Sequence, residues 1–160
     1  MRLFKKSKEL VLLSPAHGTV IGLQEVPDPV FARGTLGPGF AVVPNDRTVV
    51  SPVAGVVSAV FPSHHAVVIE ATDGVQVLVH AGLDTVQLEG RHLQTAVSVG
   101  ENVEPNDPLI HWDPAAVAAE GYATHVVVCL IESGPFSDLQ VRSGIAVPGT
   151  VAATATRVSR

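Results

Sequence analysis

Short stretches rich in valine, threonine and isoleucine recur along the chain, and glycine, proline, asparagine and aspartate separate them about every eight to twelve residues. This spacing is typical of an antiparallel β-sandwich or barrel, because each strand must end in a turn before the next one pairs with it. Only one segment favours a helix. In "DPAAVAAEG", Asp113 can cap the first turn, Pro114 suits the first helical position and Gly121 can end the helix. We therefore expect an all-β fold with one or two very short helices.

An internal echo predicts a duplicated unit within this fold. The segment "SPAHGTVIGL" from Ser14 is similar to "SPVAGVVSAV" from Ser51, 37 residues later, and each reads as a turn that leads into a strand. A third segment, "VSVGENVEPNDPLIHW", has the alternating valines and turn residues expected where one strand follows another at a sheet edge. The fold prediction is therefore an antiparallel sandwich, or barrel-sandwich, with an internal duplication.

Size and composition fit a single domain. Of the 160 residues, 46% are hydrophobic and 16% are charged, which is enough apolar surface for one packed core. We expect residues 1–9 to form an N-terminal tail and residues 10–160 to form the domain. The formal net charge of −5 argues against nucleic-acid binding and favours a protein partner or a small anion. The longest apolar runs have about six residues, well below the roughly 20 of a membrane-spanning helix, so no integral membrane segment is expected.

Cys129 is the single cysteine, and it lies within the apolar run "VVVCLI". One cysteine cannot form a disulfide within the chain and is typical of a reducing compartment, so we expect a cytoplasmic protein. We interpret Cys129 itself as a small buried hydrophobic residue.

The segment from His65 to His80 predicts a β-hairpin whose turn contains Thr72, Asp73 and Gly74. Side chains alternate between the two faces of a sheet, so the length of the loop decides whether the two histidines meet. A loop of four or of two residues places His65 and His80 on one face, whereas a loop of three residues places them on opposite faces.

An even loop gives the two imidazoles an apolar setting. Leu78, Val67 and Ile69 then share their face, and the alternation of side chains excludes His64 from it. Burial favours the neutral imidazole ring, whose unprotonated nitrogen is a nucleophile.

Paired histidines serve three kinds of chemistry. A metal site needs a third ligand, which Asp84 can supply through the H-x-x-x-D spacing of "HAGLD". A general acid and base pair needs a substrate pocket with further polar groups. A phosphoryl acceptor needs one nucleophilic nitrogen, a tautomer fixed through the other nitrogen, and a second donor for the phosphate oxygens. The spacing alone does not choose among these, nor does it exclude two histidines without a chemical role.

The stretch "GVQVLVHAGLDTVQLEG", with "PSHHAVVIEA" upstream of it, closely resembles the glucose-type enzyme IIA (EIIA) of the bacterial sugar phosphotransferase system. The likeness extends over nearly the whole chain and includes "LLSPAHGTVIGLQEVPDPVFARGTLGPGFAVVP", "VVSPVAGVVSAVF" and "VGENVEPNDPLIHWD". The resemblance implies a β-sandwich phosphotransferase component that accepts a phosphoryl group from a histidine of the carrier protein HPr. It then implies transfer of this group to a cysteine of a sugar-specific EIIB domain; which sugar is served cannot be read from this chain.

Five positions match the active-site motif of the EIIA family. The resemblance implies that His80 is phosphorylated at Nε2 and that His65 hydrogen-bonds the phosphoryl group. It also implies that the Gly82 carbonyl holds the Nδ1 proton of His80, and that Asp84 is the acidic residue after the active-site bend. Ser63 stands where the family usually has a threonine, so the hydroxyl is kept. No cofactor is implied.

The resemblance further implies an apolar docking surface for partner proteins. The positions that match it are Val30, Phe31, Leu36, Phe61, Leu78 and Leu83. A basic rim on HPr would suit the acidic balance of this chain. Because family members often regulate other proteins, we also expect phosphorylation-dependent binding of further targets, with a regulatory zinc ion at His65 and His80 as an open alternative.

Besides Ser63, three positions depart from the family's pattern. His125 replaces a proline before the strand "VVVCLI", Glu132 stands for an aspartate after it, and Ala81 is smaller than the usual apolar residue that follows the active-site histidine. The roles of Glu132 and His125 are therefore left open.

The rival interpretation is a lysostaphin-type zinc peptidase, which would use His80 and Asp84 as metal ligands. Those enzymes need a later H-x-H pair, and the histidines after Asp84 are His92, His111 and His125, each isolated in the sequence.

Overall fold

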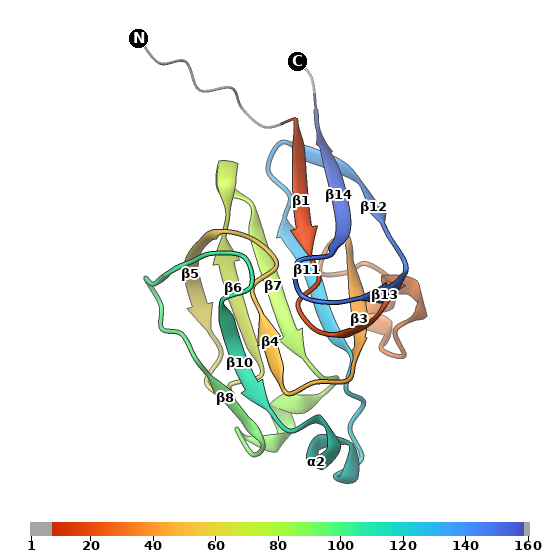
Figure 1. Cartoon of the computed structure of the whole chain (residues 1–160), viewed down its shortest axis with the longest axis vertical. Helices are drawn as coiled ribbons and strands as arrows, with labels where there is room; N and C mark the ends of the chain where they lie inside the picture. The colour runs from red at the N-terminus through yellow and green to blue at the C-terminus, as the bar shows by residue number, and fades with distance from the viewer. Residues whose placement is uncertain (1–7, 159–160) are drawn as a thin grey trace.

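The computed structural model describes residues 8–158, and these form three antiparallel β-sheets with two short α-helices (Figure 1). The largest sheet has eight strands in the order β13-β2-β3-β11-β7-β6-β5-β9. Its strands, in that order, span Gly144–Ala146, Gly18–Gly22, Gly39–Pro44, Val126–Glu132, Gln76–Ala81, Ala66–Glu70, Gly55–Val60 and Asn102–Val103. Two three-stranded sheets, β1-β14-β12 and β4-β10-β8, complete the fold. Their strands, in those orders, span Glu9–Leu13, Val151–Arg157, Phe136–Val141, Thr48–Val50, Pro108–Trp112 and Leu93–Thr95. The prediction of an all-β antiparallel sandwich is confirmed.

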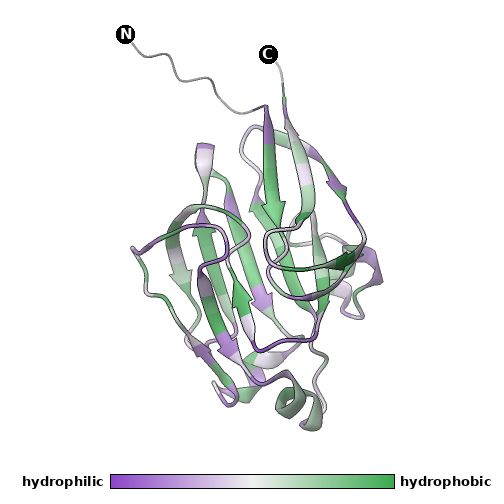
Figure 2. Ribbon diagram, viewed as in Figure 1, coloured by the Kyte–Doolittle hydropathy of each residue, from purple (hydrophilic) through white to green (hydrophobic). Residues whose placement is uncertain are grey.

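The eight-stranded sheet is covered on both faces. On one face its side chains, such as Val67 and Val79, pack against the two smaller sheets in the main core. Val68 and Leu78 alternate with them and point to the opposite face, where a smaller apolar cluster forms with Phe31 of the short helix α1 (Pro29–Ala32). Figure 2 shows the hydrophobic colour running along much of the strands, with hydrophilic colour at strand ends and loops. The second, smaller cluster is the one that borders the candidate site.

The two echoing segments adopt the same local geometry. Ser14 and Ser51 are fully buried, and each hydroxyl donates to the carbonyl two residues on, that of Ala16 at 2.7 Å and that of Val53 at 2.6 Å. A buried hydroxyl is costly without such a bond, so the serine fixes the turn. Each turn leads into a strand of the large sheet, β2 and β5. The internal duplication is therefore confirmed, and β9 lies at the edge of that sheet with β10 following it, as the third segment predicts.

Both α-helices begin with an Asp-Pro pair. In α2 (Pro114–Ala119), the Asp113 side chain accepts a hydrogen bond from the backbone N–H of Ala116, as predicted. In α1 (Pro29–Ala32), Asp28 accepts one from the backbone N–H of Val30. Three short 3-10 turns span Leu23–Glu25, Thr72–Gly74 and Thr85–Leu88.

The first and last strands are neighbours. β1 begins at Glu9, within the segment predicted as a tail, and Glu9 lies opposite Thr156 of β14. The rest of that predicted tail, apart from Lys8, lies outside the described residues. None of the helices within residues 8–158 is both long enough and apolar enough to cross a membrane.

Candidate active site

His80 lies near the end of β7, on the face of the eight-stranded sheet that carries the smaller apolar cluster. Its Nδ1 is 2.7 Å from the carbonyl oxygen of Gly82. A carbonyl can only accept, so Nδ1 carries the proton and donates, and Nε2 keeps a free lone pair. The ring is half-buried, and the Phe31 ring meets it edge-on with centroids 5.2 Å apart. The tautomer of His80 is therefore the one that leaves the ring's lone pair on Nε2.

The bend after β7 holds the Gly82 carbonyl in place. Gly82 has φ +77°, and a Cβ at this position would lie 2.4 Å from Cγ2 of Thr85, so only glycine fits. The Gly82 N–H donates to the His125 carbonyl at 2.8 Å, and the Leu83 N–H donates to the Ala123 carbonyl at 3.0 Å. These two bonds attach the bend that carries the Gly82 carbonyl to the segment 123–125. His125 takes part in the site through its backbone carbonyl.

His65 lies beside His80. The two ring centroids are 5.0 Å apart and nearly perpendicular, and the Phe61 ring packs edge-on against His65 at 5.4 Å. Only 4% of His65 is exposed, and its Nδ1 is buried without a hydrogen-bond partner among the described residues. Burial, and then the neighbouring His80, lower the pKa of His65 from 6.5 to about 4. His65 is therefore a neutral ring at physiological pH.

Asp28 is a charged neighbour of the site that the sequence analysis missed. Burial lowers the pKa of His80, while the hydrogen bond to Gly82 and the negative charge of Asp28 act in the opposite direction. Asp28 reaches this position because α1 starts there and carries Phe31 over the His80 ring. The Asp-Pro helix start in "VPDPVF" was the available signal, since it has the same form as the start recognised at Asp113.

The prediction of how the two histidines meet was wrong in its geometry. Ala66, not His65, lies opposite His80, and the regular pairing ends at Glu70 and Gln76, which leaves an odd loop of the five residues 71–75. Regular alternation would place His65 on the other face of the sheet. The rings nevertheless meet; His65 directly precedes β6, and His64 before it has φ +60°.

The apolar neighbours predicted for the pair also need correction. Val67 and Ile69 point into the main core on the far face, and Ala66 and Val68 take their place beside Leu78. His64 is absent from the pair, as expected, because its Nδ1 lies 2.9 Å from the Thr95 hydroxyl oxygen instead.

Asp84 and Ser63, two other predicted site residues, and Glu132, whose role was left open, differ in their exposure to solvent. Asp84 is exposed and has φ +57°, at the start of the 3-10 turn Thr85–Leu88. Ser63 is half-buried in the bend before His65. Glu132 is exposed at the end of β11, next to Ile131, and Gln76 pairs with it across the sheet. The chemical roles of Asp84 and Ser63 stay predictions.

The six apolar positions of the predicted docking surface fall into two groups. Val30, Leu36 and Phe61 are exposed by 47%, 38% and 37%. Phe31, Leu78 and Leu83 are each at most 5% exposed and pack in the smaller apolar cluster, and their part in partner binding stays a prediction.

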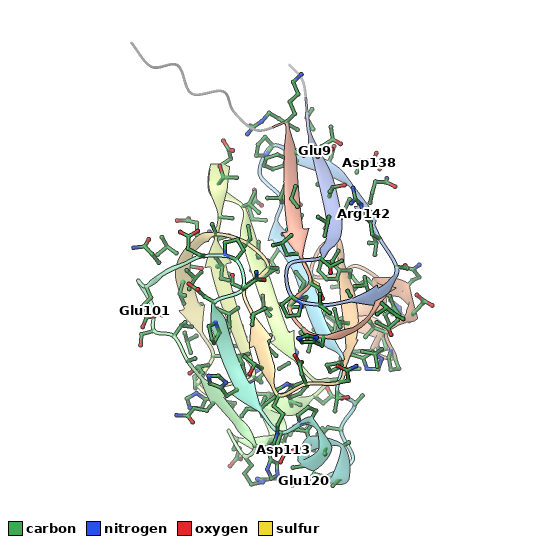
Figure 3. The ribbon with its side chains drawn as sticks, viewed as in Figure 1. Glu9, Glu101, Asp113, Glu120, Asp138 and Arg142 are labelled. Carbon is green, nitrogen blue, oxygen red and sulfur yellow. The ribbon has the colours of Figure 1, made fainter. Side chains whose placement is uncertain are left out.

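A separate polar hollow of about 500 Å³ lies away from the histidine pair, beside α2. Its lining includes Arg47, His92, His111 and Asp113, and Arg47 Nη2 lies 2.6 Å from Asp113 Oδ2. In Figure 3, Asp113 lies with Glu120 at the lower end of the molecule. We use the name polar hollow for this region below.

Comparison with known proteins identifies the family. The model of the phosphoenolpyruvate-dependent sugar phosphotransferase system EIIA 1 family matches residues 10–135. The chain belongs to this family. Curated glucose-specific EIIA components from Staphylococcus aureus (strain Mu50 / ATCC 700699) and Staphylococcus epidermidis (strain ATCC 12228 / FDA PCI 1200) are 42% identical to it over 116 residues, 70% of this chain and of each relative. The structure of the glucose permease IIA from Mycoplasma capricolum superimposes with a TM-score of 0.86 at 35% identity, over 96% of this chain and 99% of that one.

As an EIIA protein, the chain is a phosphoryl-transfer component of a sugar-uptake system. The alternative of a lysostaphin-type zinc peptidase is not supported. Asp84, its second proposed ligand, is exposed, and within residues 8–158 no three histidine, cysteine, aspartate or glutamate side chains gather as metal ligands.

Proposed function

We propose that this EIIA protein carries a phosphoryl group on Nε2 of His80. The observation that supports it most directly is the 2.7 Å contact between His80 Nδ1 and the Gly82 carbonyl. It leaves Nε2 unprotonated before the reaction, and it stabilises the positive charge that spreads over the ring when Nε2 forms a bond to phosphorus.

The relay has two balanced steps. In the first, the lone pair of His80 Nε2 attacks the phosphorus carried by a histidine of HPr, and the N–P bond on HPr breaks. In the second, a cysteine thiolate of an EIIB domain attacks the same phosphorus, and the N–P bond on His80 breaks. The proton stays on His80 Nδ1, which donates it to the Gly82 carbonyl in a hydrogen bond throughout, so neither step needs a separate acid or base on this chain.

His65 supplies the second imidazole of the proposed site. Its lowered pKa keeps it neutral, so it has one N–H to donate to a phosphoryl oxygen and no positive charge to hold the phosphate too tightly. A reversible relay needs this balance, because the group must leave for the next partner. The apolar surroundings of the pair limit the access of water to the phosphohistidine.

The proposed partners are other proteins. Val30, Leu36 and Phe61 provide exposed apolar contacts at the edge of the site, and the net charge of −5 favours the basic surface of a partner such as HPr. The curated relatives are named glucose-specific, so glucose is the first sugar to test with an EIIB domain. We place the relay in the cytoplasm, because phosphoenolpyruvate is made there. Binding of regulated targets, and a zinc ion shared with them at His65 and His80, stay predictions.

Labelling with phosphoenolpyruvate, enzyme I and HPr tests the proposal. The wild-type protein should gain one acid-labile, base-stable phosphate, and His80→Gln should gain none. His65→Gln should still be labelled but should pass the group on to EIIB about ten- to a hundredfold more slowly, because one hydrogen bond to the transferring group is lost.

His111→Gln is the matched control, since His111 is an exposed histidine on β10 outside the site, and it should behave as wild type. Normal labelling of His80→Gln would contradict the assignment of the nucleophile. Unimpaired onward transfer by His65→Gln would contradict the role of the second imidazole.

A further inference from the structure

His64 has no place in the relay described above, yet it occupies a strained and well-anchored position next to it. Its φ is +60°, a region that costs free energy for residues with a Cβ and that asparagine, aspartate and histidine occupy more often than other residues. The bend around it is closed by two backbone bonds, from the His64 N–H to the Phe61 carbonyl at 2.9 Å and from the Phe61 N–H to the Ala66 carbonyl at 3.0 Å. Something must hold the chain in this conformation.

The His64 side chain provides such an anchor. Its Nδ1 lies 2.9 Å from the hydroxyl oxygen of Thr95 and 3.4 Å from the Thr95 backbone nitrogen. A backbone N–H can only donate, so Nδ1 is the acceptor and the hydroxyl donates to the same nitrogen. The ring is also close to Gly90, where a Cβ would lie 3.4 Å from His64 Cδ2.

Thr95 belongs to a different sheet from the site. It ends β8, where it lies opposite Ile110 of β10, and the next residue bonds onward through the Ala96 N–H to the Leu109 carbonyl at 2.8 Å. Leu109 and Ile110 are fully buried in the main core. The His64 side chain thus connects the bend beside the large sheet to a rigid part of the three-stranded sheet.

This connection explains why the two active-site rings meet. In the pairing of β6 with β7, Ala66 lies opposite His80 and shares its face of the sheet. If the strand continued regularly, His65 would therefore point to the opposite face. The His65 carbonyl still accepts the Ala81 N–H at 2.7 Å, and the chain leaves the strand conformation at the residue before it, His64, with φ +60°. We infer that His64 is a positioning residue, whose hydrogen bonds to Thr95 hold the 61–65 bend so that His65 faces His80.

The inference deepens the proposed function, because it concerns the same pair of imidazoles. Four substitutions at one position separate the hydrogen bond from the backbone conformation. His64→Leu keeps a bulky side chain but has no acceptor, and His64→Ala removes both. His64→Gly relieves the positive φ without an acceptor, whereas His64→Asn tolerates the positive φ and offers an amide oxygen to Thr95.

The first readout is the proximity of the two rings, measured as NMR cross-relaxation between the His65 and His80 ring protons in the folded proteins. We expect this contact to be lost in His64→Leu, His64→Ala and His64→Gly, and to be kept in His64→Asn. Onward transfer to EIIB should slow about ten- to a hundredfold in the first three variants and should be near the wild-type rate in the fourth. Denaturant unfolding of each variant checks that the protein stays folded.

His111→Leu is the matched control, because its ring also lies near a threonine hydroxyl, with Nδ1 3.4 Å from Thr48 Oγ1, in the same three-stranded sheet. It should change neither readout. Retained ring contact and wild-type transfer in His64→Gly would overturn the inference, as would a His64→Asn variant as impaired as His64→Leu. The ring contact needs no phosphoryl transfer, so this result is independent of whether His80 is the nucleophile.

Discussion

Histidines cluster in two regions of the molecule, and these regions differ in burial and in charged neighbours. At the active site, His65 and His80 lie over an apolar cluster and meet the rings of Phe31 and Phe61. Burial lowers the pKa of both imidazoles there. Beside the polar hollow, His92 from its lining instead shares the Glu120 carboxylate with Arg91.

Neighbouring side chains and backbone N–H groups lower the pKa of the carboxylates in the second region. Hydrogen bonds from Arg91 and His92 lower the pKa of Glu120, and the Ala116 N–H and then the charge of Arg47 lower the pKa of Asp113. The contrast shows that one residue type serves two chemistries. On the apolar sheet face burial favours the neutral imidazole, whereas at the exposed rim an imidazole lies beside a carboxylate and a guanidinium.

The largest effect is expected from removal of the apolar cover. Phe31→Ala deletes a ring that is 5% exposed, so the free energy of unfolding should fall by about 3 kcal/mol or more. It also opens His80 to water, so the pKa of His80 should rise toward the ordinary value of histidine. Denaturant unfolding and NMR titration of the imidazole measure the two changes. A loss of stability with no rise in the His80 pKa would show that Phe31 does not create the dry setting.

A second prediction concerns pH. The pKa of His65 is lowered from 6.5 to about 4 on folding, so between these values the unfolded chain binds the proton that the folded protein excludes. The contribution of His65 to stability is fully present above pH 6.5 and is lost as the pH falls toward 4, by about 3 kcal/mol in total.

Urea unfolding of wild type and His65→Gln at a series of pH values measures this contribution. The difference in the pH dependence of their unfolding free energies isolates His65, and His111→Gln serves as the exposed-histidine control. Parallel pH profiles for wild type and His65→Gln would exclude a buried neutral His65.

The smallest effect is expected at the polar hollow. Glu120→Gln removes the carboxylate shared by Arg91 and His92, but these side chains are exposed and solvent screens their attraction. The contribution of the pairing is present at neutral pH and is lost as the pH falls through the lowered pKa of Glu120. Unfolding at low and high salt should show a small loss that salt diminishes. A loss as large as that of Phe31→Ala, or one independent of salt, would contradict the contrast between the regions.

Much of this organisation could be predicted from the sequence, because it rests on local signals. Turn residues mark the strands, the Asp-Pro start and Gly121 mark α2, and the motif around His80 identifies both imidazoles. Residue patterns of this kind depend on neighbours along the chain, so no tertiary information is needed to interpret them.

The features of the site that could not be predicted depend on backbone conformation and on tertiary packing, which the sequence pattern does not reveal. The five-residue hairpin loop contains Asp73 with φ +56° in the 3-10 turn Thr72–Gly74, and His64 has φ +60° in the bend before His65. Burial of Leu78 and Leu83 likewise depends on the covering of the large sheet by α1. The position of Asp28 near His80 follows from the same helix, which is too short to leave a periodic pattern.

The adjacent β1 and β14 place both ends of the described chain at one end of the molecule, with the Lys8 carbonyl bonded to the Arg157 N–H at 2.8 Å (Figure 1). A short peptide could therefore join the two ends into a ring, and the chain could then be cut at an exposed loop to give a circular permutant with the same sheets. For the same reason, two fluorescent labels attached at the two ends would stay close while the sheet is intact and would separate when β1 detaches from β14.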